Sequence, residues 1–260
     1  MFGWFKKWRR DRIARQPFPS RWRAIIEANV PYYRLLPGDD RVELLRHVRI
    51  FLAEKRFEGV QGFVVTDEVR LTIAAMACVL LLHRTTNYFS GLKTIIIYPG
   101  SFVSSHVERF DSGFELIGPE TRLGEAWHRG PILLSWPDVQ EAMGETTDGS
   151  NVVYHEFTHH LDWSVGRGEG SRIFDRRKDL KRWLEVLSRE YLRLQKDVQR
   201  GRDTFLDDYG AESPAEFFAV VTECFFEMSR DLRDHHPELY EQLKIFYHQD
   251  PAALMENLPE

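Results

Sequence analysis

Residues 151–162 read NVVYHEFTHHLD, and within them His155, Glu156 and His159 form the pattern H-E-x-x-H. On a helix, residues four positions apart lie on one face, with their Cβ atoms about 5–6 Å apart. His155 and His159 can therefore direct ring nitrogens at one zinc ion, and Glu156 lies beside that ion, where it can take a proton from a metal-bound water. The alternative is a helix whose histidines hydrogen-bond to neighbouring groups and whose glutamate faces water.

The residues around this pattern indicate a partly buried helix. Val152 and Val153 precede the pattern, and Phe157 and Leu161 continue its apolar character. Histidine rings embedded in such a helix need polar partners, and a metal ion provides one. Asp162 follows on the same face, where a carboxylate could orient a ligand imidazole through its second nitrogen. The alternative for this residue is an exposed acid at the end of the helix.

A catalytic zinc ion normally has three protein ligands and one open position, so a third ligand is required. The extended pattern H-E-x-x-H-x-x-G-x-x-H would place glycine at position 162 and histidine at position 165. This chain has Asp162 and Val165 there. The third ligand must therefore come from a more distant segment.

Glu216 is the candidate for the third ligand. It lies in the first turn of a helix whose residues 217–226 are mostly apolar, so we expect its carboxylate to be desolvated and to require a cation or a hydrogen-bond donor. The same glutamate also completes a capping box that starts at Ser213, in which it would only bond back to the Ser213 amide. The residues alone leave both roles open. Three other acids nearby are weaker competitors: Asp207, Asp208 and Glu212.

The rest of the chain indicates a helix-dominant α+β fold. The 260 residues are 43% apolar, which is enough to bury a substantial core. Periodicity predicts helices on both sides of a small middle region that contains strands. The expected helices cover residues 39–58, 67–83 and 172–200, the histidine pattern, and segments that begin at Pro214 and near Pro237; the expected strands cover residues 94–98 and 132–136.

Composition limits the class of protein and its location. The net charge of −5 and the pI of about 6.1, without any nucleic-acid-reading motif, argue against binding to nucleic acid. Cys78 and Cys224 lie far apart in apolar helical runs, which predicts buried free thiols rather than a disulfide. Free thiols are typical of a reducing compartment, so we expect a cytoplasmic protein. The longest apolar run, Ile73 to Leu82, is too short to cross a hydrocarbon layer of about 30 Å.

Residues 1–16, MFGWFKKWRRDRIARQ, combine aromatic side chains with six lysines or arginines and one aspartate. They lack the apolar run and the cleavage site of a secretory signal, so we expect them to be retained. A basic aromatic helix is typical of a membrane interface or of an arm that docks to a partner. The alternative is an exposed and loosely ordered terminus.

Three stretches resemble the Mlc titration factor A family of zinc peptidases, whose catalytic core is similar to that of anthrax lethal factor. They are HEFTHHLD at residues 155–162, YGAESPAEFFAVVTECFF at 209–226 and GEAWHRGPILLSWPDV at 124–139. The resemblance covers about residues 85–230 and implies a zincin-like metallopeptidase domain. Because the sequence changes from helical periodicity to short strands after residue 85, we expect this domain at residues 86–260, preceded by a helical segment at residues 1–85. The alternative is that both parts form one compact unit.

The resemblance also implies roles for individual residues. His155, His159 and Glu216 would bind one zinc ion per chain. Glu156 would be the catalytic carboxylate, and Tyr209 would be the active-site tyrosine that donates to the developing oxyanion. The alternative for Tyr209 is a side chain at the edge of a turn.

The chain departs from the lethal factor pattern at one position. That pattern has a second glutamate four residues after the ligand, whereas this chain has Val220. The carboxylate that supports the metal ligands is therefore absent or has moved to Glu223, which shares the helix face of Glu216.

We expect the protein to hydrolyse peptide bonds in a peptide or protein substrate, and the resemblance links this activity to the regulation of sugar uptake through a transcriptional repressor. The strand at residues 132–136 would lie at a sheet edge beside the active-site helix, where an extended peptide could add; the alternative is an ordinary core strand. A second hypothesis is a non-catalytic protein that sequesters an Mlc-like repressor, and a third is a closed structural zinc site. Glu156 favours the enzyme, since metal ligands alone would suffice for a structural zinc ion.

Overall fold

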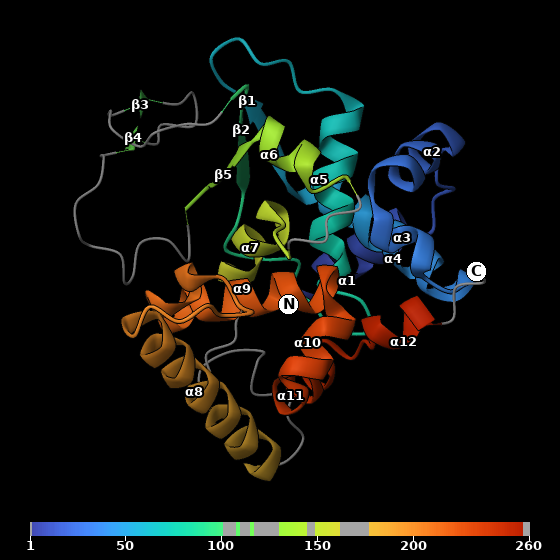
Figure 1. Cartoon of the computed structure of the whole chain (residues 1–260). Helices are drawn as coiled ribbons and strands as arrows, with labels where there is room; N and C mark the ends of the chain where they lie inside the picture. Colours follow the sequence, from blue (N-terminus) through green and yellow to red (C-terminus); the bar gives the residue numbers. More distant parts are fainter. Residues whose placement is uncertain are drawn as a thin grey trace.

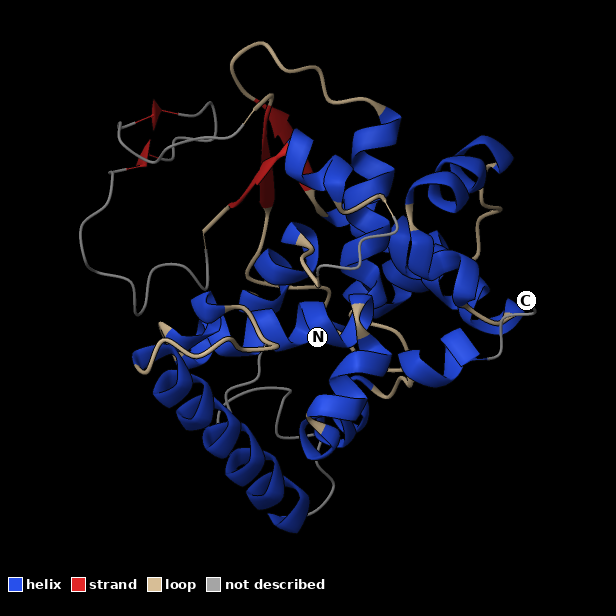
Figure 2. Cartoon of the chain, in the orientation of Figure 1, coloured by secondary structure: helices blue, strands red, loops and turns tan. Residues whose placement is uncertain are grey.

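The computed structural model describes residues 2–100, 108–109, 115–116, 130–144, 149–161 and 177–256, and helices dominate this part of the chain (Figure 1 and Figure 2). The helices are α1 (Phe2–Ala14), α2 (Ser20–Asn29), α3 (Pro31–Leu35), α4 (Gly38–Glu54), α5 (Asp67–Val79), α6 (Trp136–Glu141), α7 (Val152–His159), α8 (Arg177–Gln199), the 3-10 helix η3 (Asp208–Ala211), α9 (Pro214–Glu227), α10 (Ser229–His235), α11 (Pro237–Tyr247) and α12 (Pro251–Glu256). The strands are β1 (Arg56–Gly59), β2 (Thr94–Tyr98), β3 (Glu108–Arg109), β4 (Glu115–Leu116) and β5 (Ile132–Ser135). The expected helix-dominant α+β class is confirmed.

A three-stranded parallel sheet with the order β1-β2-β5 lies beside the helices. In its register, Ile95 pairs with Ile132 and Ile97 pairs with Leu134. These four side chains join the main apolar core, whereas Ile96 belongs to a second cluster on the opposite face of the sheet. The central strand β2 is therefore covered on both faces, which explains why its sequence TIIIY is almost continuously apolar.

The strand expected at residues 132–136 is confirmed as β5, which forms one edge of this sheet and packs against α7. Trp136, however, begins α6. The hydroxyl of Ser135 accepts a hydrogen bond from the backbone N–H of Asp138 at 3.4 Å, and Pro137 occupies the first turn, where its missing N–H costs nothing. A cap and a proline therefore end the strand and start the helix.

The prediction of a helix over residues 39–58 is wrong at its end, because α4 stops at Glu54 and β1 follows. β1 pairs with β2 along its whole length, so its backbone hydrogen bonds are made with residues far along the chain. The intervening Lys55 is buried, and its ammonium group donates to the carbonyl oxygens of Phe89 and Leu92, both at 2.7 Å. These nonlocal bonds outweigh the weak helix propensity of a short segment.

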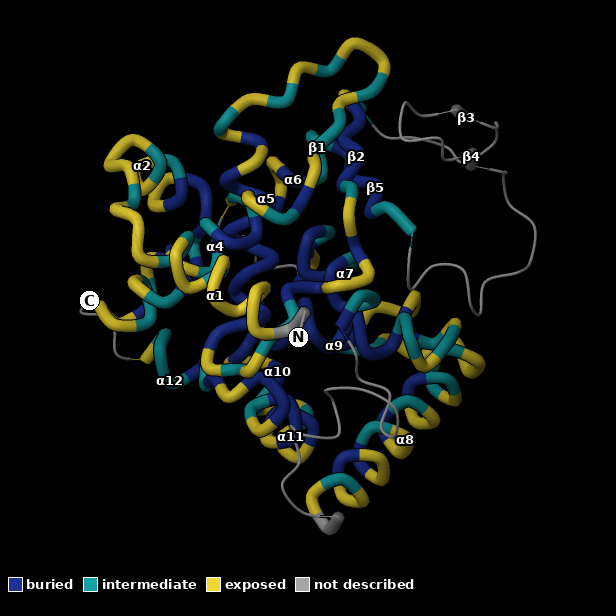
Figure 3. Tube along the Cα trace, turned by 180° about the vertical axis from the view of Figure 1, so that it is seen from behind, coloured by how far each residue is buried: buried dark blue, intermediate teal, exposed yellow. Residues whose placement is uncertain are grey.

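The helices α5 and α9 are the most deeply buried. All residues from Leu71 to Val79 in α5 and from Phe217 to Phe226 in α9 are buried. The sequence predicts that the first of these helices extends to His83, but it ends at Val79 and continues as tight turns. Figure 3 shows the same contrast: α9 and β2 are largely buried, whereas α1 and α8 expose much of their surface.

One apolar core connects the amino-terminal helices to the rest of the described fold. The ring of Phe51 in α4 contacts that of Phe157 in α7, with 5.6 Å between the centroids, and Phe89 contacts both rings. Side chains from both sides of the boundary expected near residue 85 contribute to this core. The division of the chain into two parts at that boundary stays a prediction. Among the described residues, no helix combines the length and the apolar character needed to cross a membrane.

Candidate metal centre and active site

The helix α7 carries the H-E-x-x-H pattern and begins at an asparagine cap. The side-chain oxygen of Asn151 accepts hydrogen bonds from the backbone N–H groups of Val153 and Tyr154, at 3.1 and 3.0 Å. Both capped residues are buried in the core. This fixes the rotation of the helix and leaves His155 and His159 only partly buried on its other side. Sequence reasoning missed this cap, although asparagine before an apolar helix is a recognised signal.

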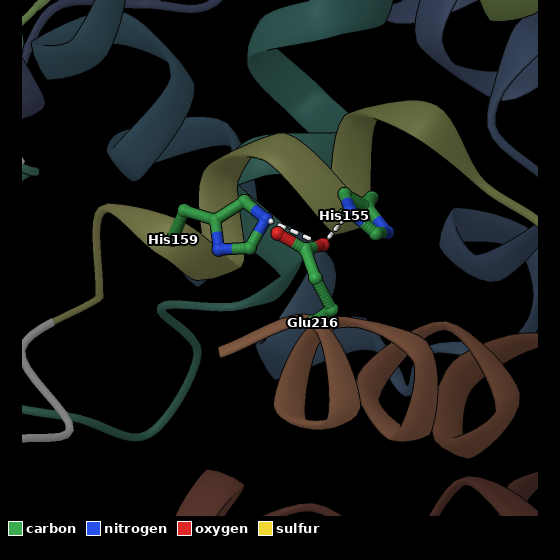
Figure 4. Close-up of side chains that lie close together, drawn as sticks. All are labelled: His155, His159 and Glu216. Atoms are coloured by element: carbon green, nitrogen blue, oxygen red, sulfur yellow. Dashed lines mark hydrogen bonds and ion pairs between the residues drawn. The ribbon is translucent and has the colours of Figure 1, made fainter. Parts of the chain in front are cut away.

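Two histidines from α7 and one glutamate from α9 converge at a single point (Figure 4). The Oε2 atom of Glu216 lies 3.0 Å from Nε2 of His155 and 3.3 Å from Nε2 of His159. Tetrahedral zinc with ligand distances of about 2.0–2.2 Å would separate neighbouring ligand atoms by about 3.3 Å. The spacing and the chemistry of these donors therefore fit a metal ion. Asp162, expected to orient one imidazole, lies outside the described residues.

The position of Glu216 reconciles the two roles that the sequence leaves open. The hydroxyl of Ser213 accepts a hydrogen bond from the backbone N–H of Glu216 at 3.1 Å, so the serine half of the capping box is present. The carboxylate of Glu216 points to the histidines. Two competing acids serve elsewhere: Asp207 caps η3 through the Tyr209 N–H, and Asp208 accepts a bond from Thr204.

Glu223 provides the supporting carboxylate that Val220 cannot provide. Its Oε1 atom lies 2.6 Å from Nδ1 of His155, and its Oε2 atom accepts a hydrogen bond from the backbone N–H of Asn151, also at 2.6 Å. A hydrogen bond from Nδ1–H to a carboxylate leaves Nε2 as the lone-pair donor, which is the tautomer that a metal requires. Of the two alternatives left open by the sequence, an absent supporting carboxylate or one that has moved to Glu223, these contacts favour the second.

The charges of the cluster are strongly coupled. Burial alone would lower the pKa of His155, but its hydrogen bonds to Glu216 and Glu223 outweigh this effect and raise the pKa to about 10. Burial alone would raise the pKa of Glu216, but its bonds to His155 and His159 lower the pKa to about 2. Without metal, the cluster therefore holds a carboxylate and a protonated imidazole.

Zinc affinity is expected to increase about tenfold per pH unit between about pH 7 and pH 9. A metal ligand must be a neutral imidazole, and a pKa of about 10 keeps His155 protonated in the metal-free chain throughout this range. Protons therefore compete with zinc, and acidification weakens binding. Competition against a chelator of known affinity, repeated across the pH range, measures the slope.

Two substitutions control this measurement. Glu223→Gln removes one of the carboxylates that raise the pKa of His155, so the pH dependence should become flatter. Glu190→Gln is the matched control, because Glu190 contacts His236 at 3.0 Å and neither residue belongs to the cluster. It should leave the slope unchanged. A native chain whose zinc affinity did not vary with pH would contradict a protonated His155.

Tyr209 lies beside the cluster on η3. Its ring centroid is 5.9 Å from that of His155, and 46% of its surface is exposed. The next residue, Gly210, is packed so tightly that a Cβ atom would lie 3.2 Å from the side chain of Leu194 and 3.4 Å from that of Val220. This packing holds η3 against α8 and α9. Burial, then the nearby Glu216, raises the pKa of Tyr209 to about 12, so its hydroxyl remains a donor at neutral pH.

A cavity of about 380 Å³ adjoins the cluster on the side of His155 and Tyr209. Phe205 and Val220 contribute apolar surface to its wall. Its acidic lining residues are Asp138, Glu141, Asp207 and Glu223. The site therefore has room next to the metal ligands for part of a bound molecule, in acidic surroundings.

The fold and the site define a zincin-like metallopeptidase: a buried helix presents two histidines of an H-E-x-x-H pattern, and a second helix supplies a glutamate. A family model described as glucose-regulated metallo-peptidase M90 matches residues 5–248, and the chain belongs to this family. This confirms the resemblance drawn from the sequence.

Similar proteins match most of the chain. An uncharacterized protein of Synechocystis is 38% identical over 246 residues, which are 94% of this chain and 89% of the relative. Mlc titration factor A of Pectobacterium atrosepticum is 30% identical over 239 residues, 91% of this chain and 88% of the relative. Mlc titration factor A of Serratia proteamaculans is 32% identical over 228 residues, 86% of each chain.

Proposed function

We propose that the chain is a zinc-dependent peptidase with one zinc ion held by His155, His159 and Glu216. The observation that carries this proposal is the convergence of two imidazoles and one carboxylate, whose ligand atoms all lie within 4.8 Å of one another. Such a ligand set is typical of catalytic zinc sites, which keep one position open. The three side chains are 15%, 20% and 21% exposed, which supports an open site rather than a closed structural one.

Glu156 serves as the general base and general acid. When bound, the zinc ion supplies a Lewis acid at the cluster. Glu156 accepts a proton from the attacking water and passes it to the departing amine. Burial raises the pKa of Glu156, and this effect exceeds the lowering of the pKa by the neighbouring histidines. This shift favours a carboxylate that both takes and returns a proton near neutral pH.

Tyr209 stabilises the charge that develops on the carbonyl oxygen of the scissile bond. Its hydroxyl stays protonated at neutral pH, and its ring lies next to that of His155. A hydrogen bond to a developing oxyanion stabilises the transition state more than it stabilises the bound substrate, and it therefore lowers the activation barrier. An extended substrate would pair with the edge strand β5, which packs against α7, the helix that carries His155 and His159.

The activity is linked, in this proposal, to a transcriptional repressor that controls sugar uptake. The family description includes glucose regulation, and several relatives are named Mlc titration factor A. The same names support the alternative of a non-catalytic protein that sequesters an Mlc-like repressor. The buried thiols of Cys78 and Cys224 support a reducing, cytoplasmic location for either function.

Digestion of a peptide library by the zinc-loaded chain tests the proposal. We expect cleavage that chelation abolishes and added zinc restores. Tyr209→Phe should lower kcat by about 100-fold because it removes only the hydroxyl that stabilises the oxyanion. Tyr33→Phe is the control, because Tyr33 contacts Arg41 and lies outside the cluster. Cleavage unaffected by chelation would refute a metal-dependent activity, and full activity of the Tyr209 variant would remove the proposed donor.

A further inference from the structure

The outer face of α1 carries three large aromatic side chains in contact with water. Trp4, Phe5 and Trp8 are 67%, 59% and 55% exposed. Because Trp8 follows the other two by four and three residues, all three rings lie on one side of the helix. The rings of Trp4 and Phe5 meet edge to face, with 5.2 Å between the centroids. We call these three residues the aromatic face of α1.

Basic side chains make up much of the remaining exposed surface of α1. Asp11 is the single acidic residue of α1, and the guanidinium of Arg12 lies 5.9 Å from the ring centroid of Trp8. The chain as a whole carries a net charge of −5, so this concentration of positive charge is local. The exposed basic side chains of the helix are Lys6, Lys7, Arg9 and Arg12.

The opposite side of α1 attaches it to the body of the protein. Arg10 donates through Nε and Nη2 to both carboxylate oxygens of Glu54 in α4, each at 2.8 Å. Its guanidinium also lies 4.4 Å from the ring centroid of Tyr88, and Ile13 and Ala14 pack against the core. Figure 3 shows α1 next to α4, with most of its surface exposed. These contacts fix which side of the helix faces outward.

We propose that the aromatic face of α1 binds the surface of an anionic lipid bilayer. Tryptophan and phenylalanine insert at the level of the head groups, and lysine and arginine contact lipid phosphates. An acidic protein surface would also complement the basic side chains. The bilayer fits better because it offers negative charge along the whole helix and accepts all three rings at once, without a matching pocket. Attachment of this kind is peripheral and reversible.

Sedimentation with vesicles tests the proposal on the full-length chain. We expect binding to vesicles of phosphatidylcholine mixed with phosphatidylglycerol, weak binding to phosphatidylcholine alone, and a decrease as salt is added. The triple variant Trp4→Ala, Phe5→Ala, Trp8→Ala should lower the partition coefficient at least about tenfold. Lys7→Glu with Arg12→Glu should lower it by more than about 20-fold, since each basic residue near the surface contributes about fivefold.

Matched controls lie on α8. Leu184 and Leu192 are 45% and 61% exposed, so Leu184→Ala with Leu192→Ala removes exposed apolar surface elsewhere. Lys181→Glu with Arg193→Glu reverses exposed charges on the same helix. Both controls should bind vesicles as the native chain does. Absence of binding to the mixed vesicles, equal binding to both kinds of vesicle, or unchanged binding by both α1 variants would overturn the proposal. So would α1-dependent association with an acidic protein that excludes the vesicles.

Discussion

Glu156→Gln is expected to lower kcat/KM for peptide cleavage by about 10²- to 10⁴-fold while the chain still binds one zinc ion. Glutamine has nearly the same shape as glutamate, but its amide cannot take a proton from water. The three donors of the cluster are His155, His159 and Glu216, so this substitution leaves them in place. Loss of catalysis with retained metal would assign Glu156 to proton transfer.

Metal analysis and steady-state kinetics on the same preparation measure this outcome. Glu212→Gln is the matched control, because Glu212 is exposed near η3 and is not one of the cluster's donors. It should keep both activity and metal. A Glu156→Gln variant with undiminished cleavage would refute hydrolysis by this site. If that variant loses cleavage but still binds an Mlc-like repressor, the two functions are separate properties of one chain.

The spacing of His155 and His159 made half of the site predictable from sequence, because it depends only on the local geometry of one helix. Glu216 was harder to assign. A ligand and a capping residue produce the same local pattern after Ser213, and only tertiary packing distinguishes them. In the structure the backbone of Glu216 uses the cap while its carboxylate reaches the histidines, so the two roles do not compete.

The strand β1 shows where local reasoning fails. Its sequence RFEG contains no β-branched residue, and nothing in it separates it from the helix before it. Its conformation comes from pairing with β2, and the buried ammonium of Lys55 bonds to carbonyl groups more than thirty residues away. Short strands held by such contacts cannot be found from periodicity, whereas β2 could be, because burial on both faces required a continuous apolar run.

Glu216→Ala is expected to lower zinc affinity by more than about 100-fold. Loss of a residue that only orients a metal ligand typically costs about 10- to 100-fold, and loss of a ligand should cost more. The backbone N–H of residue 216 would still bond to the hydroxyl of Ser213, so α9 should keep its first turn. Competition against a chelator measures the affinity, and circular dichroism reports the helix content.

Ser213→Ala is the complementary variant, and together the two substitutions separate ligand from cap. Removing the serine hydroxyl should cost about 1 kcal/mol of stability, as loss of a helix cap usually does. The carboxylate of Glu216 should remain beside His155 and His159, so zinc affinity should stay close to that of the native chain. The opposite pattern, with zinc affinity lost in the serine variant and kept in Glu216→Ala, would mean that Glu216 only caps α9. The metal would then need a different third donor. The packing of α7 against α9 would also have to be explained without a metal ligand supplied by α9.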